Sequence, residues 1–300
     1  MRARPVWLLL LGVVACTGDP GNDTADTGPQ PGDLDYYINV TDPPVGDLSC
    51  YPGGDWLTQD VDTGLQVDES VTEEIKDFEF ETPVKEATVD VWLSDAVSGQ
   101  PDKSQHADDN GDATLDLPVC TPVAYRTSVP PDLGDHKDTY ESHQIFEPGA
   151  SSPEPAPYES VAVSTYQVII NLLGVTPDPS LGVIAGTVYD CNHEPLQGAQ
   201  VVVKDADGNI PTEALVKYFV DSFPSRDQPY TSADGLWTAI NLPPGTWTIE
   251  AYVADGSGGH TEVGATTLTV FADSINISNI YTGYGDGIWY PDSCLVQTSR

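Results

Sequence analysis

The sequence has few positive charges. Its 300 residues include 11 Lys and Arg against 47 Asp and Glu, which gives a formal net charge of −36 at pH 7. An excess of negative charge this large repels phosphate backbones, so we expect no nucleic-acid binding. It instead favours a solvated exterior with weak, diffuse attraction for cations.

The sequence also lacks the short motifs that mark common enzymes. It has no G-x-S-x-G nucleophile elbow, no H-E-x-x-H zinc motif, no P-loop and no G-x-G-x-x-G that opens a helix. The histidines His136 and His143 lie in a polar stretch, where we interpret them as surface residues. Carboxylates are too numerous for any one pair to stand out. We therefore predict no enzymatic activity and no cofactor, apart from the calcium sites considered below.

Long apolar runs are missing except near the N-terminus. Arg2 and Arg4 precede an apolar run over 6–15, which is shorter than the roughly 20 residues of a membrane-spanning helix, and Ala15 then precedes Cys16. This stretch resembles a bacterial lipoprotein signal. The resemblance implies removal of residues 1–15, a lipid on Cys16 and attachment to the membrane. With Thr17 after the cysteine it favours the outer membrane, although sorting differs among bacteria. An ordinary secretory signal with an incidental cysteine is the alternative.

Cysteine is scarce, with four residues beyond Cys16: Cys50, Cys120, Cys191 and Cys294. An even number in an exported protein favours disulfides, and three pairings are possible. We prefer Cys50–Cys120 with Cys191–Cys294, because each bond then stays within one predicted domain. The absence of C-x-x-C spacing argues against a redox motif or a thiolate zinc site.

Residues 16–49 form an acidic stretch rich in Gly, Pro, Asp and Thr, which we interpret as a flexible tether. Residues 50–146 then contain strand-like segments, of which 86–93 alternates apolar and polar side chains with period two. We expect a diverged β-sandwich in this region.

Residues 147–180 combine a proline-rich linker with a predicted helix over 164–174. Ser164 and Gln167 have capping-box spacing, and Gly174 stands where a left-handed cap would end the helix. A strand over 161–170 is the alternative. The expected apolar face of the helix consists of Tyr166, Ile169, Ile170 and Leu173.

Residues 181–283 read as about seven short strands closed by Gly, Pro and Asp turns. They resemble the carboxypeptidase regulatory-like (transthyretin-like) β-sandwich, which implies a non-catalytic module. The residues that match its motif are Asp190, Pro195, Gly198, Ala199, Val201, Ser232, Asp234, Gly235, Leu242, Pro243, Pro244 and Gly245. The large core residues are expected to be Trp237, Trp247, Tyr252 and Phe219.

The first sandwich region contains a weak echo of the second. Residues 83–91 align without gaps to 195–203, and Gly111 aligns to Gly235, while Glu86 replaces Gly198. We therefore predict an all-β chain with two Ig-like or transthyretin-like sandwiches in tandem and one short helix between them. The alternative is a single well-formed sandwich behind an irregular, disulfide-tied region.

Two groups of residues are candidate ligand sites. Asp108, Asp109 and Asp112 form one oxygen-rich turn, and Asp205 and Asp207 form another. Neither has the EF-hand pattern, and we interpret both as ordinary turns, with weak Ca²⁺ binding as the alternative.

Aromatic residues mark the C-terminal tail, 284–300. We interpret Trp289 and Tyr290 as residues that pack against the protein, with stacking on a sugar or a peptide as the alternative.

Together these features predict an exported, lipid-anchored, non-catalytic protein with an adhesion, scaffold or binding role. A carbohydrate- or calcium-binding module and an accessory component of a hydrolase are the alternatives. The partner, a protein or a polysaccharide, is not specified by the sequence.

Overall fold

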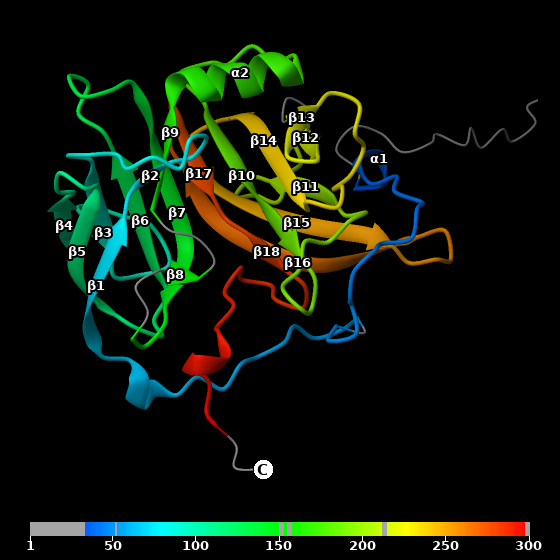
Figure 1. Ribbon diagram of the computed structural model, residues 1–300. Helices are drawn as coiled ribbons and strands as arrows, with labels where there is room; N and C mark the ends of the chain where they lie inside the picture. The colour runs from blue at the N-terminus through cyan, green and yellow to red at the C-terminus, as the bar shows by residue number, and fades with distance from the viewer. Residues whose placement is uncertain (1–33, 52, 150–152, 155–157, 212–214, 298–300) are drawn as a thin grey trace, which may run out of the picture.

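The protein is almost entirely β-structure, as the computed structural model shows (Figure 1). The structure describes residues 34–297 except 52, 150–152, 155–157 and 212–214. The predicted leader, Cys16 and the first half of the tether lie outside these residues. The two α-helices are short: α1 covers Leu34–Tyr37 and α2 covers Val163–Leu173. No helix in the described ranges is long and apolar enough to cross a bilayer.

The first sandwich packs a two-stranded sheet against part of a much larger one. The small sheet pairs β1 (Asp68–Glu74) with β5 (Asp112–Pro118). The facing strands are β3 (Thr88–Trp92), β4 (Lys103–His106), β6 (Val123–Ser128) and β7 (His136–Phe146). Shorter strands line its edge: β2 (Lys76–Asp77), β8 (Pro153–Glu154) and β9 (Glu159–Ala162).

The second sandwich has a three-stranded sheet in the order β11 (Gln200–Lys204), β15 (Gly245–Ala254) and β16 (His260–Val270). Its other layer contains β10 (Gly182–Tyr189), β12 (Leu215–Val220), β13 (Phe223–Ser225), β14 (Leu236–Leu242), β17 (Ser274–Ile277) and β18 (Ile280–Tyr281). These bounds agree closely with the strands expected from the turns in the sequence.

Strand β17 joins the two sandwiches into one sheet. Its neighbours are β10 of the second sandwich and β7 of the first, both parallel to it, so that Ile275 lies opposite Val183 on one side and Thr139 on the other. The result is a continuous sheet of 13 strands, visible in Figure 1 where the orange β17 runs between β7 and β10. The sandwiches are therefore tandem in sequence but share a hydrogen-bonded seam.

The two covering sheets lie on opposite faces of this sheet. Tyr125, Glu141, Ile277 and Ala185 are successive partners across it and so point to the same face. Tyr125 belongs to the first core, together with residues of β1 and β5. Ile184, which points to the other face, belongs to the second core with residues of β11 and β15. In the first sandwich, the sheet of β1 and β5 thus covers one face of the continuous sheet. In the second sandwich, the sheet that contains β11 and β15 covers the opposite face.

The two sandwiches repeat the same backbone hydrogen bonds at aligned positions. Val84 N–H donates to Ile75 O in the first, and Leu196 N–H donates to Val188 O in the second, both at 2.8 Å. Glu86 has a φ of +57° where the aligned Gly198 has +89°. The first sandwich therefore keeps the left-handed turn of the second although its glycine is gone.

The core of the second sandwich agrees only in part with prediction. Trp237 and Trp247 are buried in it. Tyr252 is buried on the other side of its sheet, beneath Ile38 and Val40. Phe219 was expected in the core, and this was wrong, because it is partly exposed and lines a groove described below.

Helix α2 follows β9 directly and packs on the second sandwich. Gly174 caps it with a φ of +72°, as predicted, and Ile170 and Leu173 pack against Val183. The expected capping box was wrong. Ala162 is the N-cap because the strand runs straight into the helix, and the Val163 N–H instead donates to Asp135 O at 2.8 Å.

Two disulfides are present, but their pairing corrects our preference. Cys50 is bonded to Cys191, and Cys120 is bonded to Cys294. The preferred pairing assumed that each domain closes on itself. Instead, residues 38–51 and 53–67 form a strap from the second sandwich to the first, with bridges from Val45 to Gln197 and from Val61 to Leu295. Each disulfide fastens a terminal segment to a sandwich.

Candidate functional site

A groove lies on the continuous sheet where it is left uncovered beside the seam. It has a volume of about 430 Å³, within the usual range for small-molecule sites. The short side chains of Ala185, Thr187 and Thr238 leave room on its floor, next to Ile275 and Ile277. We call it the seam groove.

Three neighbouring elements supply the walls of the seam groove. Helix α2 contributes Tyr166, Ile169 and Ile170, and the β12–β13 hairpin contributes Phe219. The first sandwich contributes Phe78, which follows β2 and is 49% exposed. These side chains make the groove mostly apolar.

The seam groove contains a pair of carboxyl side chains, Glu141 on β7 and Glu159 on β9. Glu141 is 1% exposed, and its Oε1 has no hydrogen-bond partner in the part of the chain that the structure describes. Its other interactions are with the Tyr125 hydroxyl and the Glu159 backbone amide. A buried polar atom without a partner costs free energy, so it marks a place where an incoming group would be stabilised.

Burial changes the protonation of both groups. Removal from water raises the pKa of Glu141 well above its usual range, and the charge of Glu159 raises it further. Burial, followed by the charge of Glu81, raises the pKa of Glu159 to about 7. Burial therefore favours the protonated form of Glu141, which can donate a hydrogen bond, while Glu159 titrates near neutral pH.

Two other polar side chains of the seam groove, Thr238 and Asn279, have hydrogen-bond partners. Thr238 Oγ1 donates to Ile184 O at 2.8 Å, and Asn279 Oδ1 accepts from the Thr187 backbone N–H at 3.0 Å. These bonds hold the strands of the floor together. Two buried atoms of the groove lining, Glu141 Oε1 and Trp237 Nε1, have no partner among the described residues. Of these two, the Glu141 oxygen is the one that can accept a hydrogen bond from a ligand.

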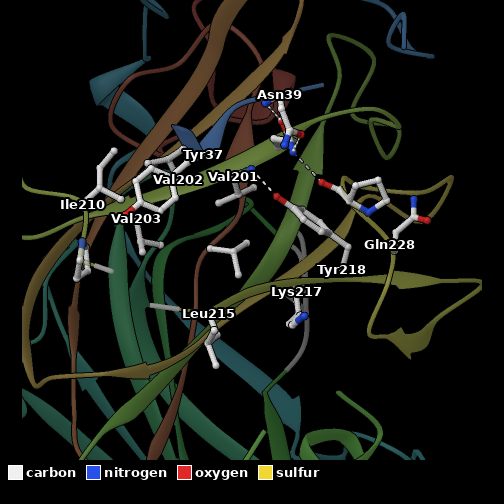
Figure 2. A pocket seen from close by; sticks show the side chains of 14 residues that line it. Tyr37, Asn39, Val201, Val202, Val203, Ile210, Leu215, Lys217, Tyr218 and Gln228 are labelled. Atoms are coloured by element: carbon white, nitrogen blue, oxygen red, sulfur yellow. Dashed lines mark hydrogen bonds between the residues drawn. The ribbon is translucent and has the colours of Figure 1, made fainter. Parts of the chain in front are cut away.

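A second cavity, of about 330 Å³, lies on the second sandwich between α1 and strands β11 and β12 (Figure 2). The Gln200 amide is bonded to Asn39 and Pro229, and the Tyr218 hydroxyl accepts from the Val201 N–H at 2.8 Å. The Tyr37 hydroxyl has no partner among the described residues, and none of the described residues that line this cavity carries a carboxylate. Its polar groups mainly attach residues 37–40 to the sandwich.

The structure places the two predicted acidic sites in separate turns, one on each sandwich. Asp108 Oδ1 accepts from the backbone N–H groups of Asn110 and Asp112, at 2.7 and 3.1 Å. Asp109 is exposed and projects from the tip of that turn. Within the described ranges, no three His, Cys, Asp or Glu side chains converge as a metal site would need.

The second acidic turn has the same construction. Asp205 Oδ1 accepts from the N–H groups of Asp207 and Asn209, at 3.0 and 2.8 Å. These hydrogen bonds lower the pKa of both Asp108 and Asp205, as expected for carboxylates that close turns.

The aromatic pair of the tail is divided between two clusters. Trp289 lies against His193, with ring centroids 3.6 Å apart, and 5.9 Å from Tyr281. Tyr290 packs near the Cys120–Cys294 disulfide, and its backbone is held by the Gln59 side chain. The two rings therefore do not form one shared platform, although Trp289 is only partly buried.

Sequence reasoning did not find Glu141 or Glu159. They are two of 47 acidic residues, and nothing in their immediate sequence sets them apart. Residues 139–146, TYESHQIF, are rich in polar side chains, which is typical of an exposed strand, yet all of them are buried in the structure.

Comparison with known proteins identifies no family. No protein-family model matches the chain, and no curated protein sequence matches it. Among solved structures, the shaft pilin SpaA of Lactobacillus rhamnosus GG is 12% identical, with a TM-score of 0.24, 74% of this chain covered and 99% of that one.

The major pilin subunit BcpA of Bacillus cereus is 11% identical, with a TM-score of 0.23 and coverage of 72% and 99%. The Bacillus anthracis TIE protein is 12% identical, with a TM-score of 0.21, and the matched part is 72% of this chain but 34% of that protein. Similarities this low carry no assignment of function.

Proposed function

We propose that this chain is an exported, lipid-anchored, non-catalytic binding protein of the bacterial envelope, and that the seam groove is its ligand site. The observation that carries the proposal is the unpartnered Oε1 of buried Glu141 in an apolar groove of ligand size. Apolar walls with a few convergent polar groups are typical of small-molecule sites.

The surroundings of the pair favour binding over hydrolysis. Two carboxyls could serve as acid and base, but Glu141 is 1% exposed and interacts with the Tyr125 hydroxyl. A protonated, buried carboxyl is suited to hold a polar group of a ligand.

The anchor part of the proposal rests on the leader and on the disulfides. Two disulfide bonds fit a protein that folds in an oxidising compartment. The resemblance of the sequence around Cys16 to a lipoprotein signal supplies the membrane attachment. Mass spectrometry of the mature N-terminus tests it: a diacylated Cys16 is expected, and an unmodified cysteine would rule the anchor out.

Nile red, a neutral apolar dye, tests the groove. We expect saturable binding with one dye per protein and an increase in emission, both lost in Ala185→Phe, which fills the floor. Val168→Phe is the matched control, because Val168 is 58% exposed on α2 and the variant adds the same ring outside the groove. Equal binding by all three proteins would place the dye elsewhere and contradict the proposal.

A further inference from the structure

We infer that the ligand of the seam groove is an apolar molecule ending in a cationic amine, and that the ammonium pairs with Glu141 and Glu159. This inference rests on the proposed function, since it names the ligand class of the same site. It follows from the charges that face the groove, from the burial of the carboxyl pair and from the charge of the whole chain.

Among the described residues, the carboxyl pair has no basic partner of its own in the groove. No lysine or arginine is among the described residues that line it. The nearest basic residue along the ladder is Lys76, which lies opposite Glu159 on β2, but its Nζ is 3.3 Å from Glu74 Oε2. A lysine on β7, Lys137, is bonded to Asp273.

The remaining titratable groups around the pair are acidic or neutral. Glu141 faces Tyr125 and Tyr158 in the first core, and Glu159 faces Glu81 in the loop after β2. Helix α2 contributes Tyr166, whose ring lies 5.1 Å from Lys137 Nζ. His136 on β7 is bonded to Ser160 and interacts with Asp77 and Asp135. A ligand must therefore bring its own positive charge if both carboxyls are to ionise.

The free energy of ionising both Glu141 and Glu159 depends on whether a cation is bound. Two carboxylates in one poorly hydrated site repel each other, so without a ligand at least one keeps its proton. An ammonium removes the repulsion and donates up to three hydrogen bonds, one of which reaches the unpaired Glu141 Oε1. Binding then converts a carboxylic acid and an ammonium into an ion pair and releases the carboxyl proton to solvent.

The negative charge of the whole protein attracts cationic ligands at long range. The net charge of −36 concentrates cations near the surface and repels anions. An anionic amphiphile of the same shape is repelled both by this net charge and by the carboxyl pair. The groove should therefore discriminate among ligands with identical tails and different head groups.

Three probes with one tail test the inference: n-octylamine, 1-octanol and octanoate, titrated calorimetrically into the full mature protein at 0.3 M salt to screen diffuse attraction. We expect octylamine to bind at least tenfold more tightly than octanol at pH 7, and octanoate to bind most weakly. The octylamine enthalpy should depend on the ionisation enthalpy of the buffer, which shows proton release. Its affinity should rise by up to about tenfold per pH unit between pH 5 and 7.

Glu141→Gln/Glu159→Gln should reduce octylamine affinity by about ten- to a hundredfold and change octanol affinity much less, because only the amine carries a charge. The control Asp109→Asn/Asp132→Asn neutralises two exposed carboxylates, and its octylamine affinity should equal that of the wild type. Urea unfolding of each variant establishes that it is folded.

Each outcome decides between the two proposals. If octanol or octanoate binds as tightly as octylamine and Ala185→Phe abolishes that binding, the seam groove remains the site and the cationic ligand class is overturned. If none of the three probes binds, or if Ala185→Phe changes nothing, the groove is not a ligand site and both proposals fail.

Discussion

Glu141 on β7 and Ile277 on β17 lie opposite each other in parallel register, on the seam where the sheet of one sandwich continues into the other. Ile277 in turn pairs with Ala185 on β10. This row places a carboxyl from the first sandwich beside apolar side chains of the second. The seam groove exists because the covering sheet changes face at this row.

The carboxyl pair makes stability depend on pH. The pKa of Glu159 rises from 4.5 to about 7 on folding. Folding therefore favours its protonated form, so its contribution is complete below about pH 4.5 and is lost as the pH rises through 7. Glu159→Gln, which resembles the protonated group, should be more stable than wild type at pH 8 by up to about 3 kcal/mol, and equal to it at pH 4.

Urea unfolding at pH 4, 6 and 8 measures this difference. Asp132→Asn, at an exposed carboxylate, is the control, and its free energy of unfolding should change with pH as that of the wild type does. If the free energy of unfolding of Glu159→Gln changed with pH as that of the wild type does, the Glu159 carboxyl would not be buried as described.

Glu86 adopts a backbone conformation that suits glycine. Its φ is +57°, its side chain is exposed, and the aligned residue of the second sandwich is Gly198. Glu86→Gly should stabilise the protein by about 1 kcal/mol, because it removes the strain of a side chain in the left-handed region.

Lys85→Gly is the matched control for this change. Lys85 is also exposed but does not have a positive φ, so the substitution should destabilise by about 0.5–1 kcal/mol through the flexibility of the unfolded chain. Chemical denaturation compares the two, and loss of stability in both would contradict the described turn.

The disulfides can be tested by peptide mapping without reduction. We expect linked peptides that contain Cys50 with Cys191 and Cys120 with Cys294. Either other pairing would show that the strap and the tail are arranged differently. Cys50→Ser/Cys191→Ser should lower the free energy of unfolding by about 2–5 kcal/mol, because the bond closes a long loop in the unfolded chain.

Asp205 should stabilise its turn even without a metal ion. Asp205→Ala removes acceptors for the Asp207 and Asn209 N–H groups and should lower the melting temperature, whereas Asp207→Ala should leave it unchanged. Because folding lowers the pKa of Asp205, its contribution is present above about pH 4 and is lost as the pH falls.

Calorimetric scans with 5 mM Ca²⁺ or with a chelator separate turn chemistry from a cation site. We expect the two scans of the wild-type protein to coincide. A Ca²⁺-dependent rise in melting temperature that disappears in Asp205→Ala would identify a cation site instead.

Local elements of this protein were predictable because short-range physics decides them. Period-two alternation over residues 86–93 located β3, and Gly174 ended α2 where the sequence predicted. Turn residues separated the strands of the second sandwich, and the repeat at 83–91 located part of the first. Each of these features depends on side chains within a few residues of one another.

The seam, the disulfide pairing and the carboxyl pair were decided only by the tertiary structure. β17 reads as the next strand of the second sandwich, and its pairing with β7 joins segments more than 130 residues apart. The pKa of Glu141 depends on which side chains exclude water from it, and those come from different strands and a helix. An acidic sequence contains many carboxylates, and only the tertiary structure brings these two together in the groove.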